Sequence, residues 1–211
     1  IELRKESLRI IQASVVDGIA IGGLSVGETR EEMETVLKAL APLYDPKRPR
    51  FLLGVGTPED LRIAVENGID MLDCVLPTRN ARHATVWRTR ETAHSGRKPA
   101  SSVLDVPIVR LRSDARSSSQ TAPSHVPASI GVDTESERIH LTNEKFKEDS
   151  SPIEVGCDCY TCANGFSKAF LRHQFKSGDP IAGTLASIHH LRYMMRICEG
   201  YRLLTTPATI S

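Results

Sequence analysis

Short apolar runs that alternate with capped helical patterns over residues 1–86 constrain the fold of this chain more than any other feature. Each run is short enough to be a buried strand, and each stops at a residue that breaks regular backbone structure. The runs lie at 19–21 before Gly22, at 51–53 before Gly54, and at 69–76 before Pro77.

Helix-start signals mark both segments between these runs. Thr29 lies three residues before Glu32, the spacing of a capping box, and an apolar face follows it. Thr57 is followed by a proline at the first helical position, and Gly68 is the expected stop. Successive strand and helix units predict an α/β fold with parallel strands and right-handed crossovers. Three strands cannot close a sheet by themselves.

The composition is that of a globular protein. Of the 211 residues, 40% are apolar and 25% are charged, which is enough for one sizeable core. No apolar run approaches the roughly 18 residues that span a bilayer, which excludes a membrane protein. The formal net charge of +1 argues against nucleic-acid binding by bulk charge alone, although a local basic patch stays possible.

Cysteine usage favours a reducing compartment, and we expect a cytoplasmic protein. The five cysteines are an odd number, and the chain shows no signal peptide. The first residue is Ile1, inside an expected helix, so we expect this chain to be part of a longer protein.

Residues 88–138 differ in character from the rest. They hold ten serines, four prolines and no aromatic residue, a composition that buries too little surface to order itself. We therefore predict three parts: strand and helix units at 1–87, a disordered insertion at 88–138, and a second ordered part at 139–211. The last part ends in helices at 165–177 and 181–203. Apolar residues at helical spacing on the second helix are typical of a core face: Leu185, Ile188, Leu191, Met194, Met195 and Cys198.

A cysteine cluster carries the strongest chemical signal. Cys157, Cys159 and Cys162 lie within six residues, and an imidazole from the later helix would complete the four ligands of a structural zinc site. The alternative is a set of free core thiols. His189 is favoured over His190 as the fourth ligand, because it lies one helical turn after Leu185. Four protein ligands leave the metal no open position, so it should stabilise the fold and not activate water. The other two cysteines, Cys74 and Cys198, are expected to be small apolar fillers.

The ends of the three expected strands form the second signal. Active sites of parallel α/β proteins lie at the carboxyl ends of strands, and these ends carry 22–24, 54–56 and Asp73. Glycines let a flat ligand approach the backbone closely. Asp73 has a structural alternative, as a helix-capping or salt-bridged residue. Arg79 and Arg82 are either a clamp for phosphate or solvated surface residues.

Four segments, taken in order, resemble the tRNA-guanine transglycosylase family of bacterial type. They are 21–28, 54–60, 70–79 and the cysteine cluster at 157–162. The resemblance covers the chain outside 88–138 and corresponds to roughly the C-terminal half of a family member. It implies that the three strands are the last three of a TIM (β/α)8 barrel, followed by a zinc-binding subdomain.

The activity implied by this resemblance is exchange of the wobble guanine of tRNA for a 7-deazaguanine base in queuosine synthesis. Asp73 would attack the ribose and form a covalent intermediate that the incoming base displaces. Gly22, Gly23, Leu24 and Leu53 match the base-binding groups. Val26 matches the bulkier residue of bacterial enzymes, which favours the aminomethyl precursor over queuine.

Further implications concern partners and cofactor. Arg79 and Arg82 match contacts to the tRNA anticodon loop, Cys157, Cys159, Cys162 and His189 match the zinc ligands, and a homodimer is expected. The chain departs from the family where His190 replaces the usual Asn and where 88–138 replaces a short hairpin connection. Two alternatives remain: a non-catalytic, zinc-stabilised subunit that binds tRNA or a catalytic partner, and an inactive truncated remnant.

Overall fold

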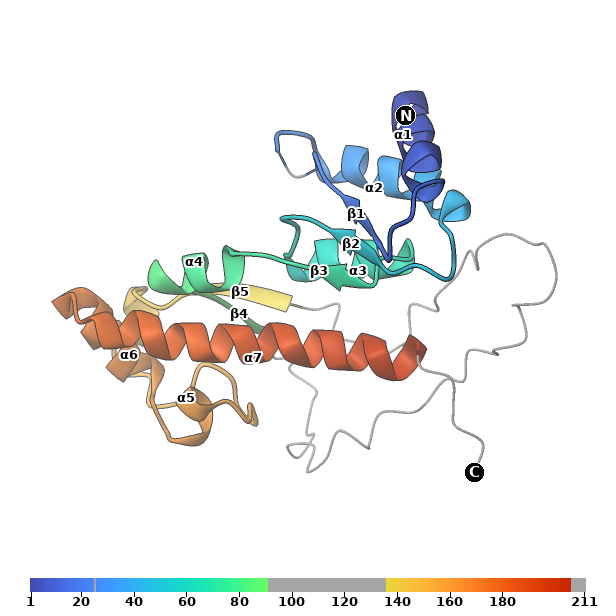
Figure 1. Ribbon diagram of the computed structural model, residues 1–211. Helices are drawn as coiled ribbons and strands as arrows, with labels where there is room; N and C mark the ends of the chain where they lie inside the picture. The colour runs from blue at the N-terminus through green and yellow to red at the C-terminus, as the bar shows by residue number, and fades with distance from the viewer. Residues whose placement is uncertain (25, 91–135, 206–211) are drawn as a thin grey trace, which may run out of the picture. The chain divides into compact units, whose positions relative to one another are not determined.

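The described residues divide into two units after Val75. The computed structural model describes residues 1–24, 26–90 and 136–205, with side chains up to residue 202 (Figure 1). One unit spans Ile1–Val75, and the other begins at Leu76. Most of the expected insertion at 88–138 lies outside the described residues.

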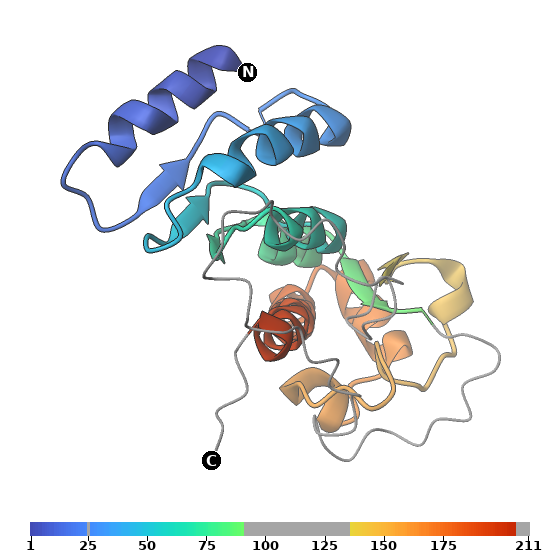
Figure 2. The same ribbon diagram turned by 90° about the vertical axis from the view of Figure 1, so that its right-hand side faces the viewer.

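The strands of the first unit pair as the apolar runs predict. β1 (Ile19–Ile21), β2 (Arg50–Leu52) and β3 (Met71–Leu72) form a parallel sheet in that order. Ile21 pairs with Leu52, which pairs in turn with Leu72, so the three carboxyl ends meet at one edge. Figure 2 shows β1 and β2 side by side and pointing the same way.

The helices of this unit begin where their caps predict. They are α1 (Glu2–Gln12), α2 (Arg30–Leu40), the 3-10 turn η1 (Ala41–Leu43) and α3 (Pro58–Glu66). Thr29 and Glu32 form the expected reciprocal capping box, and Thr57 forms a second one with Asp60. Gly68 has a φ of +81° just after α3, a conformation that costs glycine little.

Apolar side chains from the sheet and its helices form the core of the first unit. Leu37 and Leu52 are fully buried in it, and Leu24 reaches it from the loop after β1. The other buried members are Leu8, Ile19, Ile21, Met33, Leu40, Tyr44, Val55, Ile63, Ala64 and Ile69.

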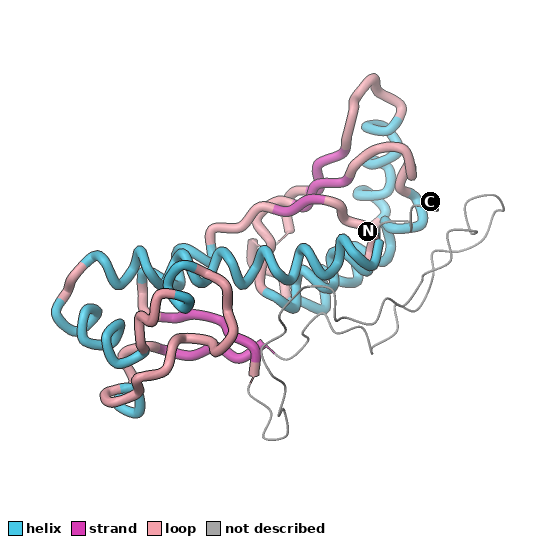
Figure 3. Tube along the Cα trace, turned by 90° about the horizontal axis from the view of Figure 1, so that it is seen from below, coloured by secondary structure: helices cyan, strands magenta, loops and turns pink. Residues whose placement is uncertain are grey.

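The second unit is built around one long helix. Its elements are α4 (Leu76–Arg82), β4 (Thr85–Thr89), β5 (Ser136–His140), the 3-10 turn η4 (Glu144–Phe146), α5 (Tyr160–Ala163), α6 (Lys168–Ser177) and α7 (Pro180–Thr205). β4 and β5 are antiparallel, with Val86 opposite Ile139, and Figure 3 shows them side by side. Both α4 and α6 pack against α7.

The structure corrects three expected boundaries. The strand expected at 69–76 is only Met71–Leu72, because β2 ends before Gly54 and offers no further partner, and α4 already begins at Leu76. The bounds expected for an insertion, 88–138, are wrong at both ends, because Arg88 and Thr89 complete β4, and Ser136 begins β5. The helix expected from 165 begins at Lys168, because Gly165 has a φ of +76° and Ser167 caps the first turn.

The expected core face of α7 is only partly buried. Leu185 and Met194 are buried, whereas Leu191 and Met195 are exposed. The buried positions between them belong instead to His189, His190 and Tyr193, since polar rings fill that side of the helix. Within the described part of the chain, no helix is both long and apolar enough to cross a membrane.

Candidate functional site

Three loops of the first unit leave the sheet at its carboxyl edge. The first loop runs through Gly22, Gly23 and Leu24, and Gly23 has a φ of +65°, where a side chain would be strained. The Leu24 side chain is buried in the core, whereas Gly22 and Gly23 are exposed, so this loop presents mainly backbone groups at the surface. Its two glycine carbonyls accept hydrogen bonds from Arg4 on α1, Gly22 O at 3.0 Å and Gly23 O at 2.7 Å.

The second loop places Leu53 beside the first. A Cβ atom added at Gly22 would lie 4.0 Å from Leu53 Cδ1, so the leucine side chain borders that glycine. Leu53 is 40% exposed, and Val26, further along the first loop, is 80% exposed. The N–H of Val26 donates to Glu28 Oε2 at 3.0 Å. Leu53 therefore supplies an apolar surface at the edge of the sheet.

Asp73 follows β3 and is exposed at the same edge. Its Oδ1 accepts a hydrogen bond from the N–H of Gly54 at 2.9 Å. Its Oδ2 has no hydrogen-bond partner among the residues that the structure describes. Within that set, Asp73 neither caps a helix nor joins a salt bridge, and its one hydrogen bond is to the backbone of the second loop. The hydrogen bond through Oδ1 fixes the orientation of this exposed carboxylate.

Arg79 and Arg82 lie on α4, in the second unit. Both side chains are exposed and are three residues apart, so they occupy the same side of this short helix. The helix packs closely on α7: a Cβ at Gly183 would lie 3.6 Å from Arg82 Cα. Two cations on one exposed helix turn form a small basic patch on a chain of balanced charge.

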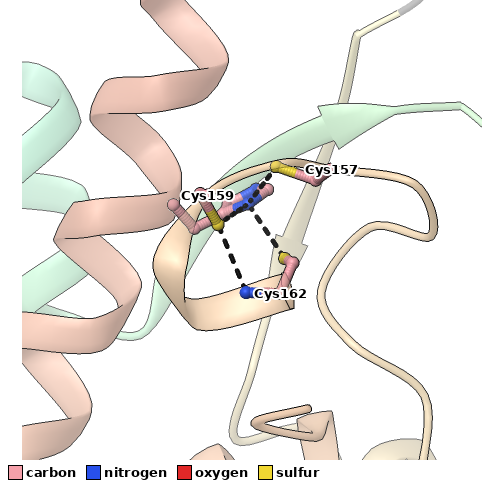
Figure 4. A group of neighbouring side chains, drawn as sticks. Cys157, Cys159 and Cys162 are labelled. Atoms are coloured by element: carbon pink, nitrogen blue, oxygen red, sulfur yellow. Dashed lines mark hydrogen bonds between the residues drawn. The ribbon is translucent and has the colours of Figure 1, made fainter. Parts of the chain in front are cut away.

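The expected metal ligands come together in the second unit. Cys157, Cys159, Cys162 and His189 are all buried, and their ligand atoms lie within 4.8 Å of one another. Figure 4 shows the three cysteine side chains pointing toward one another. The sulfur atoms lie 3.6, 3.7 and 3.4 Å from His189 Nδ1, in the order of the chain.

These distances fit zinc. An ion with bonds of about 2.3 Å to sulfur and about 2.05 Å to nitrogen, in tetrahedral geometry, places each sulfur about 3.6 Å from the nitrogen. The protonation of the cysteine thiols also fits a site for a cation. Hydrogen bonds with Cys157 and Cys162 lower the pKa of the Cys159 thiol to about 3, while hydrogen bonds with Cys157 and Cys159 raise the pKa of the Cys162 thiol. Without a cation, only part of the cluster is thiolate, whereas zinc would hold all three sulfurs deprotonated.

His189 and His190 tie this centre to β4 and α4. His189 Nε2 donates to the carbonyl of Trp87 at 3.0 Å, which orients Nδ1 toward the sulfurs. His190 Nε2 accepts from the N–H of the same residue at 3.0 Å, and His190 Nδ1 donates to Pro77 O at 2.7 Å. Burial lowers the pKa of His190 to about 4, so the ring is neutral at pH 7. The preference for His189 over His190 as metal ligand is confirmed.

The sequence did not reveal Arg4 as part of the site, and it offered His190 only as an alternative metal ligand. Arg4 stands among other cations of α1, and its contact spans 18 residues to Gly22, so no local pattern marks it. His190 contacts Trp87 across 103 residues. Cys74 is half-buried beside Gly56, and Cys198 is half-buried on α7, and neither belongs to the metal cluster.

Comparisons with known proteins agree with the four-segment resemblance. A family model described as queuine tRNA-ribosyltransferase matches residues 1–204. Proteins of that name from Psychrobacter sp. (strain PRwf-1) and Haemophilus ducreyi are both 37% identical over 95% of this chain, which corresponds to 42% and 40% of their lengths. The protein of that name from Acinetobacter baylyi is 38% identical over the same share of this chain and 40% of its own length.

The chain thus spans about two fifths of the length of these curated relatives. The family model covers nearly all of it, including the three strand-end loops and the cysteine cluster. The chain belongs to the queuine tRNA-ribosyltransferase family, that is, the tRNA-guanine transglycosylases.

Proposed function

We propose that the protein containing this chain exchanges the wobble guanine of tRNA for a 7-deazaguanine base. The observation that carries this proposal is Asp73: an exposed carboxylate at the carboxyl end of a strand, oriented by Gly54 through Oδ1. A carboxylate with one free oxygen is suited to attack a ribose carbon, the chemistry of a retaining glycosidase.

The reaction consists of two displacements. An Asp73 oxygen forms a bond to the anomeric carbon of the ribose, while the bond from that carbon to the guanine nitrogen breaks. Guanine leaves with the electron pair and takes up a proton. The incoming 7-deazaguanine then loses a proton from its ring nitrogen, attacks the same carbon and releases the Asp73 carboxylate. Two inversions retain the configuration of the ribose.

We assign base binding to the loops beside Asp73. Backbone groups of Gly22, Gly23 and Leu24 would hydrogen-bond the edge of the base, and the exposed side chain of Leu53 would cover its apolar face. Val26 would limit the size of the substituent on the base, which favours the small aminomethyl precursor over the larger queuine. The wide exposure of Val26 supports a position at the ligand surface.

The tRNA would be held in part by Arg79 and Arg82. Guanidinium groups bind phosphate through paired hydrogen bonds, and both arginines are exposed on α4.

Zinc would neutralise the three thiolates and fix α5 to α7 through His189. Its four protein ligands leave no open position, so no step of the exchange passes through it. In this proposal, residues 1–87 are the last three units of a (β/α)8 barrel. We also propose that the protein acts in the cytoplasm.

The covalent intermediate is the decisive test. The full-length protein is incubated with a labelled anticodon stem-loop RNA and resolved under denaturing conditions. We expect an RNA adduct and exchange of labelled guanine, both reduced by more than about 10³-fold in Asp73→Asn. Asp17→Asn, which changes an exposed carboxylate elsewhere in the first unit, is the matched control and should behave as wild type.

The outcomes of this test separate the alternatives. Normal exchange by Asp73→Asn would overturn the nucleophile assignment. Zinc-loaded wild-type protein that binds the RNA but forms no adduct would instead support the non-catalytic subunit. The truncated remnant is tested separately: failure of the 211-residue chain itself to stay soluble and bind zinc would support it.

We also propose that the protein is a homodimer. Tyr160, Phe166 and Phe170 form a row beside the zinc loop, with ring centroids 5.9 and 5.6 Å apart, and Tyr160 is 59% exposed. Phe166 is partly buried against the core, whereas Tyr160 and Phe170 are exposed, and neighbouring exposed aromatic rings are typical of a protein interface. Sedimentation of the full-length protein should show a dimer that Tyr160→Ser with Phe170→Ser weakens at least about tenfold. Ile181→Ser is the control, and a wild-type monomer at micromolar concentration would contradict the proposal.

A further inference from the structure

One guanidinium group holds two successive peptides of the loop after β1. Arg4 Nη1 donates to Gly22 O at 3.0 Å and Arg4 Nη2 donates to Gly23 O at 2.7 Å. A planar arginine fork presents two parallel donors, which suits two neighbouring acceptors better than a lysine ammonium does.

Arg4 differs from the other cations of α1. Lys5 pairs with Glu2, and Arg9 pairs with Glu6, each three residues earlier on the same helix. Among the described residues, Arg4 has no carboxylate partner, and its side chain bonds only the two glycine carbonyls. The helix surface therefore explains the other two cations, whereas Arg4 is directed at the loop.

The direction of the carbonyls fixes the direction of the amides. In a trans peptide the C=O and N–H groups point opposite ways, and the described part of the chain has no cis peptide bond. The carbonyls of Gly22 and Gly23 share their peptides with the N–H groups of Gly23 and Leu24. Both N–H groups therefore point away from Arg4, and within the described residues neither donates a hydrogen bond.

A cation on the carbonyl also strengthens the amide as a donor. A carbonyl that accepts a charge-assisted hydrogen bond polarises its whole peptide, which makes the N–H on that peptide more acidic. The loop thus presents two adjacent, oriented and polarised donors beside Leu53 and on the same sheet edge as Asp73.

We propose that Arg4 is a positioning residue for base binding, which fixes the loop so that the Gly23 and Leu24 amides face an acceptor on the base. The ligand class is a purine or 7-deazapurine with a carbonyl oxygen. This inference rests on the proposed function and adds to it a residue outside the strand-end loops. Arg4 itself touches the loop and not the base.

The test compares Arg4→Met, Arg4→Lys and Arg9→Met in the full-length protein. We measure KM for labelled guanine, KM for tRNA, kcat, zinc content and melting temperature. Loss of Arg4 should raise KM for guanine by roughly tenfold to a hundredfold, the effect of one or two charged hydrogen bonds. KM for tRNA should change by less than about threefold, because phosphate contacts dominate that affinity. Arg4→Lys should restore part of the affinity for guanine, and Arg9→Met should match wild type.

Each result supports or overturns the role of Arg4. An unchanged KM for guanine in Arg4→Met overturns it, and so does a parallel rise of both KM values with a lower melting temperature. If Arg4→Met does not fold, the same comparison is made with Arg4→Lys: a rise of KM for guanine without a rise of KM for tRNA supports the role, and equal changes overturn it. Wild-type protein that exchanges no guanine refutes the proposed function, and the inference falls with it.

Discussion

Gly56 shows how closely the second and third loops approach each other. A Cβ added there would lie 2.3 Å from Cys74 Cβ and 2.7 Å from Cys74 Sγ, distances that atoms cannot occupy. Gly56 is required for this contact and not for a special backbone angle. The residue after Asp73 is thus held against the loop that contains Gly54, which donates to Asp73 itself.

This contact predicts a compensating pair of substitutions. Gly56→Ala should lower the free energy of unfolding by about 2 to 3 kcal/mol, because the new methyl group displaces Cys74. Cys74→Gly removes both clashing atoms and leaves Cys74 Cα as the next nearest atom at 3.8 Å. In a double-mutant cycle measured by urea unfolding, the two changes should couple favourably by at least about 1 kcal/mol. Strict additivity would show that the loops separate freely.

At the scale of elements, His190 joins three parts of the second unit. It lies on α7, accepts from a backbone N–H of β4 and donates to the carbonyl of Pro77 in the first turn of α4. The ring of Trp87 also packs against it, with centroids 4.5 Å apart. The helix that carries Arg79 and Arg82 is therefore fixed by a residue adjacent to a metal ligand.

His190→Leu should lower the free energy of unfolding by about 3 kcal/mol, because it leaves a buried N–H and a buried C=O without partners. His190→Asn keeps one donor and one acceptor and should recover more than half of that loss. Thermal or urea unfolding of both variants checks this. Equal loss in the two variants would mean that ring packing against Trp87, and not the hydrogen bonds, accounts for the stability.

Local sequence patterns predicted where the helices and strands lie. Contacts between distant residues decided how long each element is and which of its faces is buried. The capping boxes at Thr29 and Thr57 were predictable because each involves residues three apart. The length of β3 was not, because it depends on where its partner β2 ends. The core face predicted on α7 was partly wrong, because a pattern of apolar residues gives no signal that two histidines will be buried among them.

The residues of the candidate site also fall into those that a local motif predicted and those that only the structure shows. Motif spacing led to the cysteines and to Asp73, because each lies in a short recognisable segment. Arg4 was missed and His190 was considered only as an alternative metal ligand, because the contacts of both are with backbone groups that lie far away in the sequence. Backbone groups carry no residue identity, so a sequence cannot show which side chain binds them.

At the scale of the whole molecule, the metal centre should control the stability of the second unit. Removal of zinc by a chelator, or Cys159→Ser, should abolish bound zinc and lower the melting temperature by more than about 10 °C. Amide hydrogen exchange should accelerate in α5 and around His189 in α7. Cys198→Ser is the control, since this cysteine shares α7 but not the cluster. Unchanged exchange after zinc loss would show that the core alone holds these helices.

The pairing of Thr89 with Ser136 makes the junction between β4 and β5 a tolerant place to lengthen or shorten the gene. Thr89 and Ser136 lie directly opposite each other, so the distance that any connecting segment must bridge is that of a hairpin. The entropy of closing such a loop grows only slowly with its length. Sequence can therefore be gained or lost here over evolutionary time with little cost to the core, and the same junction can accept an engineered tag or reporter domain.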